Sequence, residues 1–296
     1  MTVNVDVLCV GHASYDLIFS VSLHPGADEK IVADSLLSCG GGPAANAAVC
    51  VTKLGLTSAF AGYLGHDLYG DKHAQEFNDY GVDTRLTIRG GSPTPLSAIL
   101  VKPDGKRCLI NYKGDTQALP ADALKLSHIP AKVVLFDGHE PLISLPLVET
   151  ARQAGIPTVL DAGSMHEGTL ALMSHVDYLV CSEKFAGQYA GDEHKALSQL
   201  AELAPFVIIT LGERGLIWQR GNERGALPAY PITAIDTTGA GDAFHGAFAA
   251  GLAAGMDWQS LLRYASAAGA LCCMQMGARL GLPGRKEHEL LFNQTI

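Results

Sequence analysis

Short apolar runs separated by polar turns follow the chain from one end to the other. The first run, residues 3–10, stops at Gly11 and predicts a central strand followed by a loop. From residue 133 onward, strand-like and helix-like segments alternate, which is typical of a parallel sheet with helices on both faces. The strands predicted in this part are 133–136, 158–160, 178–180 and 206–210, and the predicted helices are 142–154 and 193–203.

Glycine and proline mark the helix boundaries in the first third of the chain. Pro43 stands just inside the start of a helix predicted over 44–54, and Gly55 stands just past its end. The next predicted elements are a strand over 58–63 and a helix over 67–80 that ends at Gly81. Towards the C-terminus, the segment 241–276 predicts mainly helix.

Two segments alternate only weakly between apolar and polar positions. Residues 16–38 contain Pro25 and Gly26 between apolar positions, which suits a hairpin with one exposed face. The runs 96–101 and 108–112 are joined by the turn Pro103-Asp104-Gly105. Together these segments predict a small sheet that is separate from the main one.

Composition and charge narrow the functional classes. The 296 residues are 48 % hydrophobic and 17 % charged, as in a globular protein with a sizeable core. The formal net charge of −9 makes nucleic acid and anionic membrane surfaces poor partners. No apolar run reaches the ~18 residues of a membrane span, and the first residues lack the features of a signal peptide. The seven cysteines include no Cys-x-x-Cys pair, which favours reduced thiols in a cytoplasmic protein.

The stretch richest in chemistry is Asp236-Thr237-Thr238-Gly239-Ala240-Gly241-Asp242, between the strand-like run 232–235 and a predicted helix. Glycines and unpaired amides at a helix start can form an anion site. A carboxylate there would repel a bound phosphate, but it suits phosphoryl transfer, in which Asp242 takes the proton of the attacking hydroxyl. The alternative is that Asp242 only interacts with the helix dipole and that the glycines serve the turn. A P-loop motif is absent, and Gly246 comes too late to be the third glycine of a dinucleotide motif.

Two long motifs resemble the signatures of the ribokinase-like (PfkB) carbohydrate kinases. The run DTTGAGDAFHGAFAAGL at 236–252 is similar to the C-terminal signature. GGGPAANAAVCVTKLG at 40–55, followed by GYLGHDLYG at 62–70, is similar to the N-terminal one. Within the family, GGGPAAN and the segments 110–112 and 277–283 resemble most the sulfofructose kinase and ketohexokinase branch.

The resemblance covers essentially the whole chain and implies both a fold and an activity. The expected fold is a ribokinase-like α/β domain over residues 1–296, with a central, mostly parallel sheet flanked by helices. A small β-lid is expected at about 12–38 and 87–114. The expected activity is ATP-dependent transfer of the γ-phosphoryl group to a sugar hydroxyl.

The resemblance also assigns roles to matching positions. The catalytic group would comprise the base Asp242 and an anion hole made by the amides of Gly239, Ala240 and Gly241. Sugar binding is expected at Asp16, Gly41, Gly42, Asn46, Asn111 and His139, and nucleotide binding at Thr210, Gly212, Gly215, Ser182, Glu183 and Thr238. Mg²⁺ is expected to accompany ATP, and a monovalent cation, K⁺, is implied near Asp236 and Thr238.

From the residues alone, simpler interpretations of these positions stay open. Asp16 would also suit an ordinary turn, and Asn46 would suit the polar start of a helix. The segment 210–215 is equally typical of a plain turn between two strands. His139 would also suit a loop in which it meets only a backbone partner.

Two departures from the family pattern bear on the ligands. The family's Asn-x-x-Glu motif falls on Ser182 and Phe185, which leaves Glu183 as a substitute contact for metal or phosphate. Where sulfofructose kinases carry an arginine for the sulfonate, this chain has Gly138-His139, and a mostly neutral histidine is a weaker anion partner. We therefore expect an uncharged, ketose-like sugar. A nucleoside or other small-alcohol kinase and a non-catalytic ligand-binding protein are the alternatives.

A homodimer is predicted from the small sheet. Its apolar positions exceed what a single layer of protein would cover, so two such sheets are expected to pack face to face. A monomer whose lid closes on its own sugar is the alternative. The positions concerned are Ile18, Val21, Ile31, Ile99, Val101 and Leu109.

Overall fold

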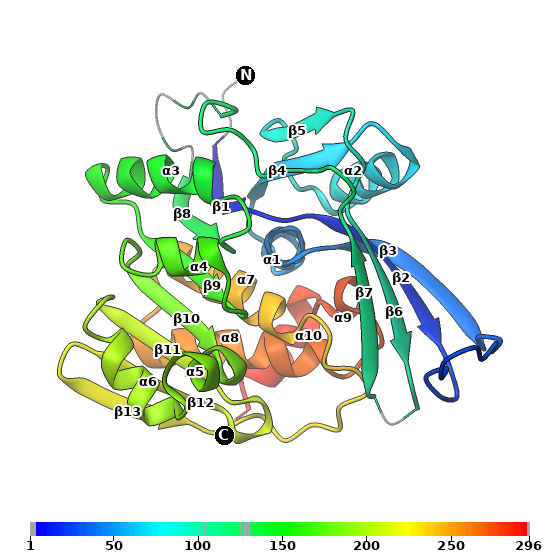
Figure 1. Cartoon of the computed structure of the whole chain (residues 1–296). Helices are drawn as coiled ribbons and strands as arrows, with labels where there is room; N and C mark the ends of the chain where they lie inside the picture. The colour runs from blue at the N-terminus through cyan, green and yellow to red at the C-terminus, as the bar shows by residue number, and fades with distance from the viewer. Residues whose placement is uncertain (1–3, 104, 125, 127–128, 130, 295–296) are drawn as a thin grey trace.

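The computed structural model describes residues 4–103, 105–124, 126, 129 and 131–294, and it contains two β-sheets (Figure 1). The larger sheet forms the body of the molecule with helices around it, and the smaller sheet extends from one side. Val3 and Asp104, which the sequence assigns to the first strand and to a turn, lie outside the described residues.

The larger sheet has nine strands and is mostly parallel. Its strands are β1 (Val5–Val10), β4 (Ser58–Gly65), β5 (Thr87–Gly90), β8 (Ala131–Phe136), β9 (Thr158–Ala162), β10 (Tyr178–Ser182), β11 (Phe206–Thr210), β12 (Leu216–Arg220) and β13 (Glu223–Leu227). They lie in the order β13-β12-β11-β10-β9-β8-β1-β4-β5. All neighbours from β5 to β11 pair in parallel, and only β12 and β13 add antiparallel pairs at one edge. The alternation predicted from residue 133 onward is confirmed.

Helices cover both faces of this sheet because its central strands are apolar on both sides. In β1, Val7 and Cys9 belong to one core cluster while Leu8 and Val10 belong to the other. The first cluster includes side chains of α1 (Pro43–Lys53), α2 (Leu68–Tyr80), α7 (Ala240–Ala253), α8 (Trp258–Cys272) and α10 (Arg285–Phe292). The second includes side chains of α3 (Pro141–Gln153), α4 (Glu167–Leu172), α5 (Glu183–Ala190) and α6 (Glu193–Leu200). Two short turns, η1 (Gly212–Arg214) and α9 (Ala278–Gly281), complete the helical segments.

The predicted helix boundaries near the N-terminus are confirmed by the backbone. Helix α1 has Pro43 in its first turn, and Gly55 follows its last residues with φ of 93°. Helix α2 begins after Asp67, whose carboxylate accepts a hydrogen bond from the backbone N of Gly70 at 2.8 Å. It ends at Gly81, which has the left-handed φ of 76°.

The smaller sheet, hereafter the small sheet, has four strands in the order β3-β2-β6-β7. They are β2 (Ser14–Ser20), β3 (Ser35–Gly41), β6 (Leu96–Val101) and β7 (Arg107–Tyr112). β2 and β3 form the predicted antiparallel hairpin, and β6 joins β2 in parallel. The predicted boundary at residue 87 was too early, because residues 87–90 form β5 and pair with β4 in the main sheet.

The apolar positions of the small sheet are not arranged as the sequence suggested. Ile18, Ile99 and Val101 are buried within the chain itself, and Met276 packs against them. The most exposed apolar side chains of the small sheet, those of Leu36, Ile110 and Tyr112, are on the opposite face, as the strand pairing shows. Val21 is buried. Leu109 pairs with Ile99 and so lies on the same face as Ile99, but it is 45 % exposed. Ile31 lies in the loop between β2 and β3 and is partly exposed.

One predicted strand is absent. Residues 232–235 have no strand partner, although their apolar pattern looked strand-like. The segment runs past the end of α8 instead, where the backbone N atoms of Ile235 and Asp236 donate to the carbonyl of Cys273 at 2.8 and 3.2 Å. The loop 236–242 is therefore fixed by α8 rather than by a strand.

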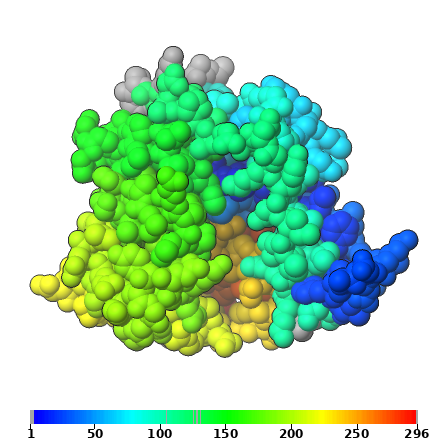
Figure 2. Space-filling model, in the orientation of Figure 1, coloured from blue at the N-terminus to red at the C-terminus, as the bar shows by residue number. Residues whose placement is uncertain are grey.

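The carboxyl ends of β1, β8, β9, β10 and β11 share one edge of the main sheet because these strands are parallel. Figure 2 shows a hollow in this face, between the green half of the molecule and the teal strands of the small sheet, with gold and orange atoms of the α7 region inside it. Ligands of open α/β sheets bind at this kind of edge. None of the helices in the described part of the chain is long and apolar enough to span a membrane.

Candidate active site

The start of the loop 236–242 is held by a buried aspartate. Asp236 Oδ1 accepts hydrogen bonds from Thr238 N at 2.9 Å and Thr238 Oγ1 at 2.6 Å, and Oδ2 accepts from Gly277 N at 2.8 Å. Arg107 of β7 reaches the same loop, donates to Thr238 Oγ1 and lies 3.9 Å from Asp236 Oδ1. The small sheet thus contacts the loop directly.

The end of this loop forms the N-terminus of α7. Gly239 is the N-cap residue with φ of 77°, and a Cβ at this position would overlap Ala278, so only glycine fits. The amides of Gly241 and Asp242 have no carbonyl partner within the helix, whereas the Ala240 amide donates to the carbonyl of Thr237 at 3.4 Å. They can therefore bind an anion at the positive end of the helix dipole.

Asp242 is paired with Asn46 of α1. Asn46 Nδ2 donates to Asp242 Oδ2 at 2.7 Å, although the two residues are 196 positions apart. Burial raises the pKa of the Asp242 carboxyl above its ordinary value, and the hydrogen bond from Asn46 opposes this increase. The carboxylate therefore has the raised basicity that suits a proton acceptor.

Asp16 lies beside the glycine-rich turn between β3 and α1. It is a buried residue of β2 rather than a turn residue, and Ser14 Oγ donates to its Oδ1 at 3.0 Å. A Cβ at Gly41 would overlap the Asp16 carboxylate, and a Cβ at Gly42, which has φ of 98°, would overlap the carbonyl of His12. Burial raises the pKa of Asp16 to about 6.

Asn111 is brought into line with Asp16 by the register of the small sheet. Asp16 pairs with Ser97 across β2 and β6, and Ser97 pairs with Asn111 across β6 and β7. Directly opposed residues point to the same face of a sheet. The three polar side chains therefore form a row on the face of the small sheet that also carries Ile18 and Ile99, hereafter its inner face.

Asp137 ties three loops together at the end of β8. Its Oδ2 accepts hydrogen bonds from the backbone N of His12 at 2.8 Å and of Ala44 at 3.1 Å, and its Oδ1 accepts from the backbone N of His139 at 2.9 Å. A Cβ at Gly11 would overlap this carboxylate. The ends of β1 and β8 and the start of α1 are thus fixed by one buried side chain.

His139 stands between two other imidazole rings. Its ring centroid lies 5.1 Å from that of His12 and 4.4 Å from that of His166, which it stacks against. Burial lowers the pKa of His12 to about 3 and lowers that of His166. These two rings are therefore neutral at pH 7.

A buried histidine, His245, connects the first turn of α7 to a buried aspartate, Asp161, of the main sheet. His245 Nδ1 is 2.6 Å from the carbonyl oxygen of Gly241 and 3.2 Å from Asp161 Oδ2, at the end of β9. Burial raises the pKa of Asp161 to about 6, and His245 opposes this effect. The pair connects the main sheet to the proposed anion site.

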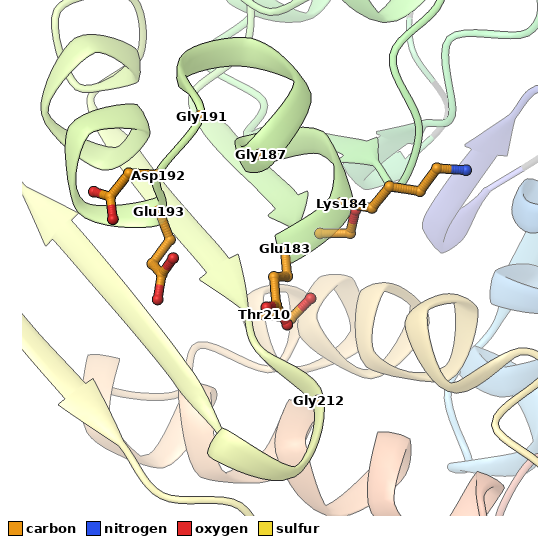
Figure 3. Close-up of a pocket in the computed structure, with 9 residues that line it drawn as sticks. Glu183, Lys184, Gly187, Gly191, Asp192, Glu193, Thr210 and Gly212 are labelled. Carbon is orange, nitrogen blue, oxygen red and sulfur yellow. The ribbon is translucent and has the colours of Figure 1, made fainter.

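A surface pocket of about 630 Å³ lies at the ends of β10 and β11. Its lining includes Ser182, Glu183, Thr210 and Gly212, which are four of the six positions predicted to bind nucleotide. Figure 3 shows Glu183 beside Thr210, with Lys184 extending away from both. Gly215 instead lies where a Cβ would overlap the carbonyl of Leu227.

The residues at the expected Asn-x-x-Glu position have structural partners. Ser182 is the N-cap of α5, accepts from the backbone N of Phe185 at 3.0 Å and donates to the carbonyl of Gly163 at 2.9 Å. Phe185 is fully buried. Glu183 pairs with Arg214 at 2.9 Å on the exposed rim of the pocket.

Side-chain oxygens that suit hard cations are present in the pocket, at Ser182 and Glu183, and in the loop before α7, at Asp236. Among the described residues, no group of three or more His, Cys, Asp or Glu side chains could hold a metal by itself. Mg²⁺ commonly takes one or two protein oxygens together with nucleotide phosphates, and Ser182 and Glu183 offer such oxygens. Asp236 accepts three hydrogen bonds of the roughly four that a carboxylate can accept, which leaves it room for one bond to a cation.

A family model described as pfkB family carbohydrate kinase matches residues 4–285. The chain belongs to this family. The ribokinase of Bacillus subtilis is 29 % identical over 293 residues, covering 97 % of this chain and 99 % of the relative. The probable fructokinase-5 of Arabidopsis thaliana is 30 % identical over 281 residues, covering 83 % and 86 %. The structure of Arabidopsis thaliana ribokinase complexed with ribose and ATP matches with a TM-score of 0.85 at 26 % identity, covering 99 % and 100 %.

The family and the ribokinase-like fold expected from the motifs are thus confirmed. In this pfkB-family chain, the predicted residues Asp242 and Asn46 are in direct contact. The binding roles of the individual residues stay predictions.

Sequence reasoning missed several polar residues of this edge. For two of them a signal was present, because Asp137 directly follows an apolar run and Asp161 interrupts another, TVLDA. Arg107, Arg279 and His245 were missed because their partners are distant in sequence, although His245 lies within the signature 236–252 and Arg279 within the segment 277–283.

Proposed function

We propose that this chain transfers the γ-phosphoryl group of ATP to a hydroxyl of a small, uncharged, ketose-like sugar. The observation that carries the proposal is Asp242, held by Asn46 in the first turn of α7, where the amides of Gly241 and Asp242 have no carbonyl partner within the helix. A base and an anion site within one helical turn suit phosphoryl transfer, whereas binding alone has no need of the carboxylate.

In the proposed reaction, Asp242 accepts the proton of the attacking sugar hydroxyl. The amides of Gly239, Ala240 and Gly241 stabilise the negative charge that develops on the transferred phosphoryl group. Asp236 and Gly277 keep this loop in place through the hydrogen bonds described above. MgATP, when bound, supplies the phosphoryl group and neutralises part of its charge.

Sugar hydroxyls would bind between the small sheet and the main sheet. Asp16 and Asn111 lie in register on the inner face of the small sheet, and Gly41 and Gly42 allow a close approach of the backbone. His139 would add a hydrogen bond from the other side. The neutral rings of its two histidine neighbours favour a sugar without an anionic group.

ATP would lie along the strand ends, with its phosphates towards Thr238 and the start of α7. Thr210, Gly212 and Glu183 line the pocket at β10 and β11, and we assign this pocket to the nucleotide. Ser182 and Glu183 would hold Mg²⁺ together with the phosphates, and Asp236 and Thr238 would contribute to a site for K⁺.

The relatives support a sugar substrate but include two sugar types. They are named ribokinase and fructokinase, and one of the solved ribokinases is described as complexed with ribose and ATP. The small sheet would act as a lid that excludes water during transfer. A homodimer, a cytoplasmic location and the absence of nucleic-acid and membrane partners complete the proposal.

ATP consumption with a panel of acceptors tests the proposal. The panel comprises fructose and other ketoses, ribose and other aldoses, a sulfonated sugar and nucleosides, each with MgATP. We expect sugar-dependent ADP formation with the largest kcat/KM for a neutral ketose. A strong preference for a nucleoside or a sulfonated sugar would contradict the substrate class, and no turnover with any acceptor would contradict the kinase activity.

A further inference from the structure

Arg279 of α9 is a fully buried arginine that contacts Asn46, the partner of the proposed base Asp242. Its side chain is 1 % exposed. Burying a cation costs several kcal/mol unless it is paired and hydrogen-bonded. Its guanidinium group meets three side chains, with Nε 3.0 Å from Asn46 Oδ1, Nη1 3.2 Å from Glu76 Oε2 and Nη2 3.1 Å from His73 Nε2.

The contact with Asn46 fixes which way the amide points. Guanidinium nitrogens only donate hydrogen bonds, so the atom of Asn46 that faces Arg279 is the acceptor Oδ1. The other end of the amide is then the donor Nδ2, and this atom meets Asp242 Oδ2 at 2.7 Å. A chain of two hydrogen bonds thus runs from Arg279 to the proposed base.

The direction of the Asn46 amide decides which form of Asp242 is favoured. An N–H donor stabilises the ionised carboxylate and lowers its pKa, against the effect of burial. If the amide were turned round, its oxygen would face the carboxylate and favour the protonated acid. Only the ionised form can accept the proton of a sugar hydroxyl.

A second contact of Arg279, with Glu76, connects it to the glycine-rich turn at the proposed sugar site. Glu76 of α2 carries the opposite charge and accepts hydrogen bonds from the backbone N of Gly40, at 3.0 and 2.9 Å for its two oxygens. Gly40 precedes Gly41 and Gly42 of the glycine-rich turn. One buried cation therefore joins the proposed base to the end of β3.

Other charged and titratable groups also act on this pair. The groups that influence the pKa of Asp242 or are influenced by it are His245, Asp137, Arg107, Asp16, Asp161, Cys50 and Cys272. The groups that interact with Arg279 are Glu76, His73, Asp16, Cys39, Tyr80 and Lys53. A test must therefore change Arg279 while these groups stay in place.

We propose that Arg279 is a positioning residue, which orients the Asn46 amide so that Asp242 stays ionised. The proposal deepens the proposed kinase function and rests on it. Arg279 does not touch the reacting atoms. Its effect on turnover passes through Asn46.

The test compares the double variant Arg279→Met/Glu76→Gln with the matched control Glu76→Gln. Arg279→Met alone would leave Glu76 without its cation, so neutralising both groups protects the fold. We expect the acid limb of the pH profile of kcat to move to higher pH by about one unit in the double variant relative to the control. The reason is that Asn46, without Arg279 to orient it, no longer keeps its hydrogen bond to the ionised carboxylate of Asp242. That shift corresponds to a roughly tenfold loss of kcat at a fixed pH on this limb. An unchanged acid limb, with only a lower melting temperature, would overturn the proposal.

A second measurement does not depend on turnover. The carboxyl signal of Asp242 is titrated by NMR in the ligand-free protein labelled with ¹³C-aspartate, and it is assigned by its loss in Asp242→Asn. We expect its titration midpoint to rise by about one unit in the double variant. A rise without kinase activity in the wild type would sustain the role of Arg279 and contradict the proposed function. Kinase activity in the wild type with no rise in the double variant would contradict the role of Arg279.

Discussion

Acidic side chains gather where the parallel strands end. Asp137 and Asp161 are buried at this edge, Asp16 is buried in β2 of the small sheet, and Asp242 lies in the first turn of α7. Burial raises the pKa of Asp16 and of Asp161 to about 6 and also raises the pKa of Asp242, so the ionised form of each of these three groups lowers the stability of the fold at neutral pH. Strongly perturbed groups that cluster in this way are typical of functional sites.

The first prediction concerns the proposed base. Asp242→Asn should fold and bind ATP but lose turnover by at least ~100-fold, because general-base contributions are typically about 10²–10⁴-fold. The amide keeps the size of the side chain and leaves the α7 amides in place. Steady-state kinetics measure the turnover, and calorimetric titration with ATP measures the binding. Near-normal turnover would show that Asp242 is not the base.

A second prediction concerns the free-energy cost of Asp16. Burial raises its pKa from 3.8 to about 6, so its ionised form destabilises the fold above pH 6, and this penalty disappears below about pH 4. Asp16→Asn should therefore increase the free energy of unfolding by about 1–3 kcal/mol at pH 8 and by much less at pH 4. Denaturant unfolding at both pH values measures the difference. A destabilised variant at pH 8 would contradict the prediction.

At this scale, contiguous motifs were the source of the candidate site residues. Asp242 and Asn46 were found because each belongs to a long signature, and the structure brings them into contact. Asp137 and Arg279 were missed because their roles arise from contacts with residues 93 and 233 positions away. Such pairings depend on the fold, so they did not follow from the position of Asp137 after an apolar run or of Arg279 within the segment 277–283.

Helices and strands were predicted best where their ends carry their own signals. Helices α1 and α2 end at glycines with positive φ, and the strands of the main sheet are apolar on both faces. Residues 232–235 show the limit, because an apolar run looks the same whether or not a partner strand exists. The switch of residues 87–90 into the main sheet likewise depends on pairing with β4.

The third prediction concerns the turn that begins α7. Gly239→Ala should lower turnover at least ~10-fold, because a Cβ overlaps Ala278 and displaces the amides of the turn. Gly155→Ala is the matched control, since Gly155 has a similar φ of 67° and nothing within 4 Å of a Cβ. Both variants bear the backbone strain of about 1–3 kcal/mol, but only Gly239→Ala should cost more than this and lose activity. Equal stability and activity in the two variants would contradict the prediction.

For the whole molecule, the two sheets meet at the proposed site. Arg107 of the small sheet reaches Thr238 in the loop before α7, and the inner face of the sheet packs on Met276. The small sheet, which the sequence predicted to be a lid, is therefore joined to the body of the molecule by apolar packing on Met276 and by the side chain of Arg107 at the loop before α7. On its inner face, Ile18, Ile99 and Val101 are buried within a single chain.

The outer face of the small sheet is where a partner would bind. Leu36, Ile110 and Tyr112 are exposed there by 59 %, 66 % and 54 %. The residues first expected at the interface, such as Ile18 and Ile99, would be poor probes because their replacement by aspartate would disrupt the core of the small sheet. A test of assembly must use the outer face.

The last prediction is that two chains pack through these outer faces. Light scattering at micromolar concentration should give twice the monomer mass of 31.1 kDa. Ile110→Asp should return the protein to the monomer, because a charge in an apolar interface is desolvated without a partner. Leu290→Asp is the control, since Leu290 of α10 is 72 % exposed and lies outside the small sheet, so this variant should keep the doubled mass. A monomer mass for the wild type at all concentrations would reject the dimer, and a doubled mass in Ile110→Asp would place the interface elsewhere.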